Sequence, residues 1–209
     1  MNLQDSYDRV AQEYTNHIYG ELAHKPFDRK MLDWLIEKVD KNGAICDMGC
    51  GPGQIVRYLY EHGAAVRGID LSAGMVAQAR QLNPDIDFQQ GDMLSLSDVP
   101  DTTFGGIAAF YSIIHIPRPQ VTDALRELKR VLRPGGVLLM SFHIGSEIRH
   151  FDEWWGEQVN VDFIFFEVAE MKANIQSAGL VLEEVIQRDP YPDVEVATQR
   201  AYIFAHKPN

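Results

Sequence analysis

The sequence predicts an α/β fold, built as a doubly wound, mostly parallel sheet with one reversed strand at its end. Short apolar runs alternate along the chain with segments whose apolar residues recur at helical spacing. The run 104–110 is almost wholly apolar, as expected of a strand that helices cover on both faces. The last two strand-like runs are joined by a turn too short to hold a crossover helix, so they should be antiparallel.

Composition bounds the class of protein and its partners. With 209 residues, 45% of them hydrophobic and 23% charged, the chain suits a single domain over 1–209. The net charge of −11 argues against a nucleic-acid partner. No apolar run is long enough to span a bilayer, and the first residues lack a signal-peptide pattern. We therefore expect no membrane association and a cytoplasmic location. We further expect a monomer or homodimer.

The first strand and the turn after it are the most informative part of the chain. Ala44–Cys46 reads as the end of a buried strand, and 54–61 carries apolar residues at helical spacing. Between them, Asp47 precedes the closely spaced glycines Gly49, Gly51 and Gly53. Glycine reaches positive φ without steric cost and lets a ligand approach the backbone. The turn is therefore suited to close contact with a small molecule. Its two cysteines, Cys46 and Cys50, lack the spacing of a metal site, and no metal is predicted.

The next elements repeat the strand–helix alternation. Residues 65–70 form a second strand that ends in Asp70. Ser72 can cap the following helix, whose inner face carries Met75, Val76 and Ala79. A weaker third strand covers 86–90 and leads to Gly91 and Asp92, and 104–110 is the fourth strand.

The second half of the chain completes the sheet. Val121, Leu125, Leu128 and Leu132 form a helical stripe, and the turn 133–136 leads into a fifth strand at 137–142. A helix over 168–178 ends at Gly179. The strands 180–186 and 201–205 follow, with the turn 189–193 between them.

Two segments lie outside the alternation. Residues 1–40 contain helical patterns, notably Phe27, Met31, Leu35 and Val39, and form a predicted N-terminal helical cap. Residues 143–166, rich in aromatic side chains, form a predicted lid-like insertion. Both adjoin the carboxyl ends of the strands, which is where ligands bind in such sheets.

Three carboxylates narrow the ligand. Asp47, Asp70 and Asp92 fall at or just after the ends of three successive strands. A carboxylate at the end of the second strand can accept hydrogen bonds from both hydroxyls of a ribose. An acid beside the glycine turn opposes a pyrophosphate but suits an ammonium or sulfonium centre. The pattern favours a nucleoside that carries an amino acid over a dinucleotide.

With these motifs in this order, the chain resembles a class I S-adenosylmethionine-dependent methyltransferase of the small-molecule type, with a methyltransferase-11/25-like domain. The resemblance runs from about Tyr7 to the C-terminus. It implies a Rossmann-like sheet of seven strands in the order 3-2-1-4-5-7-6, with strand 7 antiparallel. It also implies S-adenosyl-L-methionine as cofactor, S-adenosyl-L-homocysteine as product, and a small organic acceptor whose attacking atom (O, N or C) is undetermined.

The resemblance also assigns residues. Asp47 and the glycine turn would hold the methionine part of the cofactor, and Asp70 its ribose. Leu71 would pack on the adenine, and Asp92 and Met93 would read the adenine edge. Tyr14, in the N-terminal segment that closes over the cofactor, would contact it, and Phe110 and Tyr111 would surround the donor methyl. The implied cofactor-binding set is Tyr14, Asp47, Gly49, Cys50, Gly51, Gly53, Asp70, Leu71, Met75, Asp92, Met93, Phe110 and Tyr111.

Each assignment has a structural alternative. Gly51 and Gly53 can serve helix packing, Asp70 can cap a helix, Asp92 can be a turn residue, and Tyr14 can be a packing aromatic. If the acceptor must lose a proton, the candidate bases are His115, His143, Tyr14 and Tyr111. His115 is the first choice, although a histidine that bridges backbone groups fits the same position. His143, Trp154 and Trp155 are candidate substrate contacts, and the tryptophans can equally close the core.

Two other functions share part of this pattern. A nicotinamide-dependent oxidoreductase also has a glycine-rich turn and a distal acid. Asp47 directly before the glycines and the reversed last strand count against it. A protein that binds S-adenosylmethionine without transferring its methyl group has the same motifs, and only product formation separates it from an enzyme.

Overall fold

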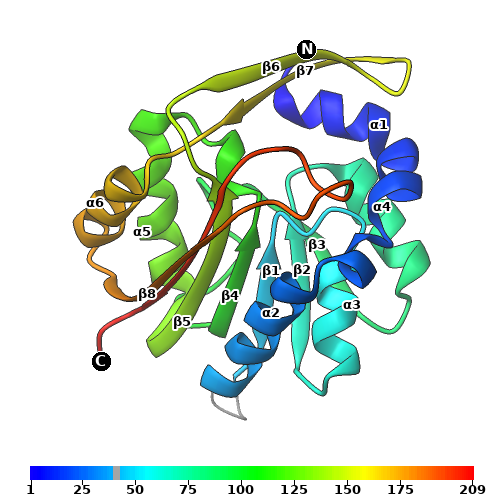
Figure 1. Ribbon diagram of the computed structural model, residues 1–209. Coiled ribbons are helices and arrows are strands. Elements are labelled where there is room, and N and C mark those ends of the chain that lie inside the picture. Colours follow the sequence, from blue (N-terminus) through cyan, green and yellow to red (C-terminus); the bar gives the residue numbers. More distant parts are fainter. Residues whose placement is uncertain (40–42) are drawn as a thin grey trace.

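The computed structural model describes residues 1–39 and 43–209 and confirms the predicted sheet (Figure 1). Its 7-stranded sheet has the order β3-β2-β1-β4-β5-β9-β8, which is 3-2-1-4-5-7-6 when the added hairpin β6–β7 is not counted. β9 runs antiparallel to both neighbours, and the other pairs in this sheet are parallel. The strands are β1 (Ile45–Met48), β2 (Val66–Asp70), β3 (Asp87–Gln90), β4 (Phe104–Phe110), β5 (Leu132–His143), β8 (Val181–Arg188) and β9 (Arg200–His206).

Helices cover both faces of the sheet (Figure 1). α2 and α3 share one apolar core with β4, β5 and β9, while α5 and α6 share another core on the opposite face. Because both faces are covered, the carboxyl ends of the parallel strands are left as the natural place for a ligand. The helices are α1 (Leu3–Ile18), α2 (Pro26–Lys38), α3 (Gln54–Glu61), α4 (Ala73–Leu82), α5 (Val121–Val131) and α6 (Val168–Ser177), with short 3-10 helices η1 (Glu21–His24), η2 (Ile113–His115) and η3 (Arg118–Gln120).

The predicted helix ends have the expected local chemistry. Ser72 caps α4, because its Oγ accepts a hydrogen bond of 3.0 Å from the Met75 N–H. Gly179 lies just beyond α6 with φ of +76°, a conformation that glycine adopts without strain. These caps fix where α4 begins and where α6 ends.

Within the N-terminal segment, α1 lies above the carboxyl edge of the sheet, whereas α2 packs on one face. Residues 1–39 form α1, η1 and α2; residue 40, the last of the predicted cap, lies outside the described residues. Asp8 of α1 accepts hydrogen bonds from Ser72 Oγ (2.6 Å) and the Gly74 N–H (2.8 Å). Ser6 Oγ accepts one from the Asn160 N–H (2.9 Å). α1 is thus tied to α4 on one side and to the 143–166 insertion on the other.

The insertion is an antiparallel hairpin that was not predicted from the sequence. β6 (Ile148–Trp154) pairs with β7 (Glu157–Ile164), and the turn residues Trp155 and Gly156 both have positive φ, as a two-residue hairpin turn requires. Val159 and Val161 are buried against Val10 of α1. The alternation of these valines with polar residues before and after is the signal that points to a strand here. In Figure 1 the hairpin and α1 lie together above the sheet.

Two further details differ from the expectation. Leu132, assigned from its spacing to the helical stripe, begins β5 instead. The predicted turn 133–136 is a bulge within β5: Phe104 pairs with Leu132, but Gly106 already pairs with Val137. Gly135, with φ of +71°, lets the backbone make this excursion.

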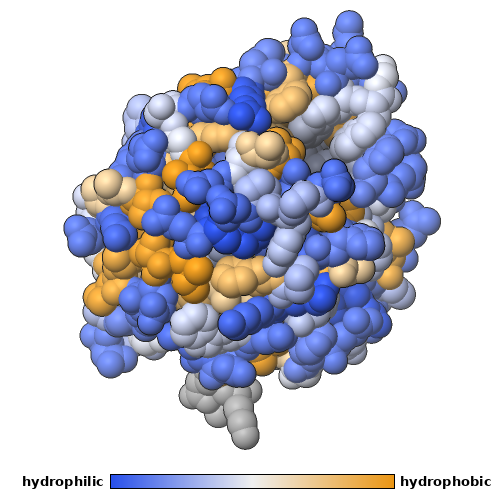
Figure 2. All heavy atoms as spheres, in the orientation of Figure 1, coloured by the Kyte–Doolittle hydropathy of each residue, from blue (hydrophilic) through white to orange (hydrophobic). Residues whose placement is uncertain are grey.

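The surface is mainly polar. In the orientation of Figure 1, hydrophilic residues cover most of the visible face, and hydrophobic atoms gather on the side where α6 and β8 lie (Figure 2). The edge strand β8 contributes the exposed Val181. Among the described helices, none has both the length and the apolar character needed to cross a bilayer.

Candidate functional site

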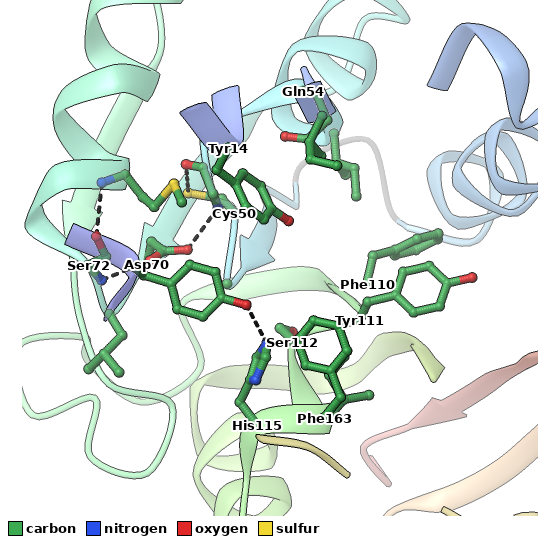
Figure 3. Close-up of a pocket in the computed structure, with 18 of the residues that line it drawn as sticks. Tyr14, Cys50, Gln54, Asp70, Ser72, Phe110, Tyr111, Ser112, His115 and Phe163 are labelled. Carbon is green, nitrogen blue, oxygen red and sulfur yellow. Dashed lines mark hydrogen bonds between the residues drawn. The ribbon is translucent and has the colours of Figure 1, made fainter. Parts of the chain in front are cut away.

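A cavity of about 450 Å³ lies at the carboxyl ends of the parallel strands. We distinguish two sides of it. The β1–β3 side is formed by the residues that follow β1, β2 and β3, including Gly51, Asp70 and Asp92. The β4–β9 side is formed by residues such as Tyr111 and Arg200, together with the start of α2 and the β8–β9 connection. Figure 3 shows Asp70 and Ser72 on one side and Phe110 and Tyr111 on the other, with Tyr14 between them.

Most of the predicted site residues line this cavity. They are Tyr14, Gly49, Cys50, Gly51, Asp70, Leu71, Met75, Asp92, Met93, Phe110, Tyr111, His115, His143, Trp154 and Trp155. Asp47 and Gly53 are not among the lining residues. A Cβ added to Gly53 would lie 3.0 Å from the ring of Phe88 and 2.9 Å from Asn83 Nδ2, so at this position glycine is needed for packing, the alternative noted from the sequence.

The glycine turn presents its backbone to the cavity. Gly49 and Gly51 have φ of +77° and +51°, a region that disfavours residues with a side chain. A Cβ on Gly49 would lie 2.4 Å from Ser112 Cβ, and one on Gly51 would lie 3.7 Å from Tyr14 Cε1. Tyr14 therefore lies directly over the turn, and a side chain at Gly51 would enter the space between them.

Asp70 joins the ends of β1 and β2. Its Oδ2 accepts a hydrogen bond from the Gly51 N–H and its Oδ1 accepts one from the Ser72 N–H, each 2.8 Å long. Burial raises the pKa of Asp70 to about 6, although these two hydrogen bonds act in the opposite direction. Each carboxylate oxygen accepts more than one hydrogen bond, so the group can hold the loop and still bind a ligand hydroxyl.

Several buried acceptor atoms near the turn have no partner among the described residues. They include both carboxylate oxygens of Asp47, the Oε1 of Gln54 and the Oγ of Ser112. Burial, followed by the charge of Asp70, raises the pKa of Asp47 well above its ordinary value. Buried polar atoms in proteins nearly always have a partner. Because Gln54 and Ser112 line the cavity, the arrangement suits a ligand that brings donors or positive charge to this side.

Asp92 is a turn residue that also lines the cavity. It lines the cavity, and its Oδ1 accepts a hydrogen bond of 2.8 Å from the Leu94 N–H, as a turn residue would. Met93, next to it, is buried and lines the same wall.

The β4–β9 side rests on a buried charge network that was not found from the sequence. Arg188 forms ion pairs with Asp28 (3.1 Å) and Glu195 (2.7 Å), and Tyr202 donates a short hydrogen bond to Asp28. Arg200 Nε lies 3.2 Å from Glu195 but makes no hydrogen bond with it, because the angle is unfavourable. No sequence motif signals this network, because its residues come from α2, β8, β9 and the β8–β9 connection.

Tyr111 connects this network to the cavity. Its hydroxyl lies 3.3 Å from that of Tyr202, and its φ is +50°, which is unusual for a residue with an aromatic side chain. Backbone conformations of this kind cost energy and cluster at functional sites. Lys25, at the start of α2, lies 5.7 Å from the centre of the Tyr111 ring.

His115 uses both of its ring nitrogens in contacts within the protein. Nε2 lies 2.8 Å from Tyr7 Oη and Nδ1 lies 3.1 Å from the Asp162 carbonyl oxygen, so the ring ties η2 to α1 and to β7. Burial lowers the pKa of His115 to about 4. The dashed line from His115 in Figure 3 marks the tyrosine contact. The geometry matches the structural alternative more closely than the role of a free base.

The two tryptophans of the hairpin turn differ in their surroundings. Trp154 makes edge contacts with Tyr7 (ring centres 5.8 Å apart) and Phe163 (5.5 Å), inside the aromatic cluster between α1 and the hairpin. Trp155 is 40% exposed and stacks on His17, with ring centres 4.8 Å apart. Trp154 thus closes the cluster, and Trp155 caps it from outside.

Comparison with known proteins shows which sequences and structures this chain resembles. Residues 45–136 match a family model described as a methyltransferase domain. A curated relative, the malonyl-[acyl-carrier protein] O-methyltransferase of Enterobacter lignolyticus, is 30% identical over 153 residues, which are 72% of this chain and 57% of the relative. The chain therefore spans a little more than half the length of that relative.

Solved structures agree on the fold. A protein from Methanosarcina mazei, titled a SAM-dependent methyltransferase, aligns with a TM-score of 0.75 at 16% identity, covering 84% of this chain and 97% of that one. The magnesium protoporphyrin IX methyltransferase of Synechocystis, solved with bound SAM, aligns with a TM-score of 0.73 at 18% identity, covering 98% and 94%. The chain therefore shares its fold with these two solved proteins.

Proposed function

We propose that this chain transfers a methyl group from S-adenosylmethionine to a small organic acceptor. The proposal starts from its match to a methyltransferase-domain model and from the fold that it shares with solved methyltransferases. The observation that carries the proposal is the group of unpartnered acceptor atoms at and beneath the glycine turn. The cofactor offers an ammonium group and a sulfonium centre, so its chemistry fits a site with acceptors in excess of donors. A pyrophosphate would bring negative charge and further acceptors to this group of unpartnered acceptor atoms and fits it poorly.

The predicted residues would each bind a different part of the cofactor. The turn at Gly49–Gly51 would face the methionine part, with Gln54 offering its free oxygen to the ammonium group. Asp70 would accept from the ribose hydroxyls, and Leu71, Asp92 and Met93 would surround the adenine. Bound there, the cofactor supplies a methyl group on a sulfonium, which already has a good leaving group.

The acceptor would lie on the β4–β9 side. Phe110 and Tyr111 line the cavity on this side, and the donor methyl is expected to point toward them. An in-line displacement needs orientation and exclusion of water more than dedicated catalytic groups, and positioning of this kind can contribute up to about 7–11 kcal/mol. α1 and the hairpin, tied to each other through Ser6 and Asn160, would exclude water from above.

The acceptor class and the cellular location are also proposals. The cavity size and its aromatic lining suit a small organic molecule, and the net charge of −11 does not favour a nucleic acid. The two cysteines are free and buried, which suits a reducing compartment such as the cytoplasm.

Calorimetric titration with S-adenosylhomocysteine, with NAD in parallel, tests the cofactor. We expect saturable one-site binding of S-adenosylhomocysteine and none of NAD. Transfer of labelled methyl from S-adenosylmethionine to a panel of hydroxyl, amine and carbon acceptors then tests the activity. Binding of NAD would contradict the nucleotide assignment, and cofactor binding without transfer to any acceptor would favour a non-catalytic binding protein.

A further inference from the structure

The two histidines that line the cavity differ in the ring nitrogens they leave available. In His115 both are used: a carbonyl can only accept, so Nδ1–H donates to the Asp162 oxygen, and the Tyr7 hydroxyl donates to Nε2. Neither nitrogen remains for a ligand unless α1 or β7 moves.

His143 uses one nitrogen. It ends β5, and its Nδ1 lies 2.8 Å from Thr198 Oγ1. Its ring stacks on Phe165, with ring centres 5.1 Å apart, and also contacts Tyr111, whose ring centre is 5.1 Å away. Two aromatic rings therefore hold the imidazole in place. Nε2 has no hydrogen-bond partner among the described residues, and it is not fully buried.

Burial, followed by nearby positive charges, keeps the His143 ring neutral. Arg200, its cross-strand partner on β9, Lys25 at the start of α2, and Arg149 on β6 are the cations that face it. Glu195, from the β8–β9 connection, is the facing anion, and Tyr111 is the neutral titratable neighbour. Burial and the three cations lower the pKa of His143 to about 4. One ring nitrogen is therefore unprotonated at neutral pH.

The contacts of the Thr198 hydroxyl favour one tautomer of His143. The Thr198 hydroxyl lies 3.4 Å from the Val196 carbonyl oxygen, which can only accept. With the hydroxyl donating to Val196, Nδ1–H of His143 donates to Thr198 and the lone pair lies on Nε2. A histidine whose tautomer is fixed through one nitrogen and whose other nitrogen is free is the usual arrangement of a general base.

We propose that His143, and not His115, contacts the methyl acceptor, and that its Nε2 accepts the proton of an attacking hydroxyl. The proposal rests on the function proposed above and deepens it by naming a catalytic residue and an oxygen acceptor. His143 Nε2 takes the proton as the acceptor oxygen forms its bond to the methyl carbon, and the electron pair of the broken carbon–sulfur bond stays on sulfur. A weak base is sufficient here, because a hydroxyl becomes strongly acidic as its oxygen is methylated. An amine that binds in its neutral form would not need this residue, since its methylated product is stable as the ammonium ion.

The first test needs no acceptor. Diethyl pyrocarbonate acylates accessible, unprotonated imidazole nitrogens, and peptide mass spectrometry identifies the modified residue. In the full chain with S-adenosylhomocysteine bound, we expect His143 to react at least about tenfold faster than His115, with the exposed His24 as the reference. Faster modification of His115 than of His143 would overturn the proposal.

The second test uses transfer of labelled methyl to a panel of phenols, enols and hydroxy acids. We expect His143→Ala to lower kcat about 100-fold or more, as loss of a general base does. Added imidazole should restore part of the rate, and the affinity for S-adenosylhomocysteine should be unchanged. His115→Gln should lower kcat less than tenfold, because His115 only holds α1 and β7 in place and does not contact the acceptor. The wild-type kcat should fall below about pH 4, as His143 gains a proton.

The outcomes separate this inference from the proposed function. Undiminished kcat in His143→Ala, or methylation of amines but of no hydroxyl in the panel, overturns the role of His143 and leaves the methyltransferase assignment standing. If the wild-type chain does not bind S-adenosylhomocysteine, the proposed function itself is contradicted.

Discussion

The two sides of the cavity are built in different ways. The β1–β3 side is made of short stretches of consecutive residues at strand ends, such as 49–51 and 70–72, and it offers backbone groups and single carboxylates. The β4–β9 side includes Asp28 of α2 and, much further along the chain, Glu195 and Arg200. Buried ion pairs of Arg188 with Asp28 and Glu195, and of Arg200 with Glu195, link these segments. The first side depends on local conformation, and the second on tertiary packing. A substitution on the first side should therefore alter ligand binding, and one on the second should alter stability.

Removal of Arg188 should give the largest effect and tests the second half of that comparison. Arg188→Met leaves Asp28 and Glu195 buried without their shared cation, and breaking such a pair costs about 3–5 kcal/mol of unfolding free energy. Urea unfolding measures this. Arg126→Met is the control, because Arg126 and its partner Asp123 are exposed, and such pairs contribute about 1 kcal/mol or less. Similar losses in the two variants would show that the network is not structurally important.

A side chain at Gly51 tests the β1–β3 side. Gly51→Val places a branched residue at φ of +51°, in the space below Tyr14, and we expect S-adenosylhomocysteine to bind at least about 100-fold more weakly, a loss of roughly 2.7 kcal/mol. Gly63→Val is matched to it: Gly63 also has positive φ (+86°), but a Cβ there meets nothing within 4 Å. Both variants carry backbone strain, and Gly51→Val alone should lose affinity. Equal calorimetric affinity in the two would contradict the turn assignment.

The features that could be predicted from the sequence are those that depend on local conformation, as on the β1–β3 side. Ser72 as a cap, the strand 104–110 and the reversed last strand were predicted, because each depends on residues close together in the chain. The cavity positions of Gly49, Gly51 and Asp70 followed from the resemblance to a family and from the rule that strand ends meet at one edge.

The remaining features depend on contacts between distant segments. Nothing near His115 in the sequence indicates that Tyr7 and Asp162 occupy its two nitrogens. The Arg188 network likewise joins residues whose separation hides their pairing. Gly53 shows the limit within a motif, because spacing alone does not distinguish a glycine that faces the ligand from one that packs against Phe88.

The pH dependence of cofactor binding tests Asp70. Burial raises its pKa from 3.8 to about 6, so the carboxylate gains a proton as the pH falls through 6. Ribose hydroxyls bind the carboxylate, so S-adenosylhomocysteine affinity should fall below that pH. The folding stability depends on pH in the opposite direction. The raised pKa contributes stability that is fully present below about pH 4 and lost as the pH rises through 6.

The variant Asp70→Asn should bind S-adenosylhomocysteine roughly 10–100-fold more weakly, as expected for loss of a charged hydrogen bond, and without this pH dependence. Unchanged affinity in that variant would remove the ribose assignment.

The smallest effect is expected at Trp155, which belongs to neither polar side. It is 40% exposed, and its main described contacts are the stack on His17 and the rings of Tyr14 and Trp154. Aromatic pairs add about 0.5–1.5 kcal/mol, and exposure to water places this one at the lower end. Trp155→Ala should therefore lower the unfolding free energy by about 1 kcal/mol or less, and S-adenosylhomocysteine affinity by less than about threefold. Trp155→Phe, which keeps a ring over His17, should recover the stability. A large loss of affinity in Trp155→Ala, measured by the same calorimetry, would show that the hairpin turn is part of the β1–β3 side and that this side is not built from strand-end residues alone.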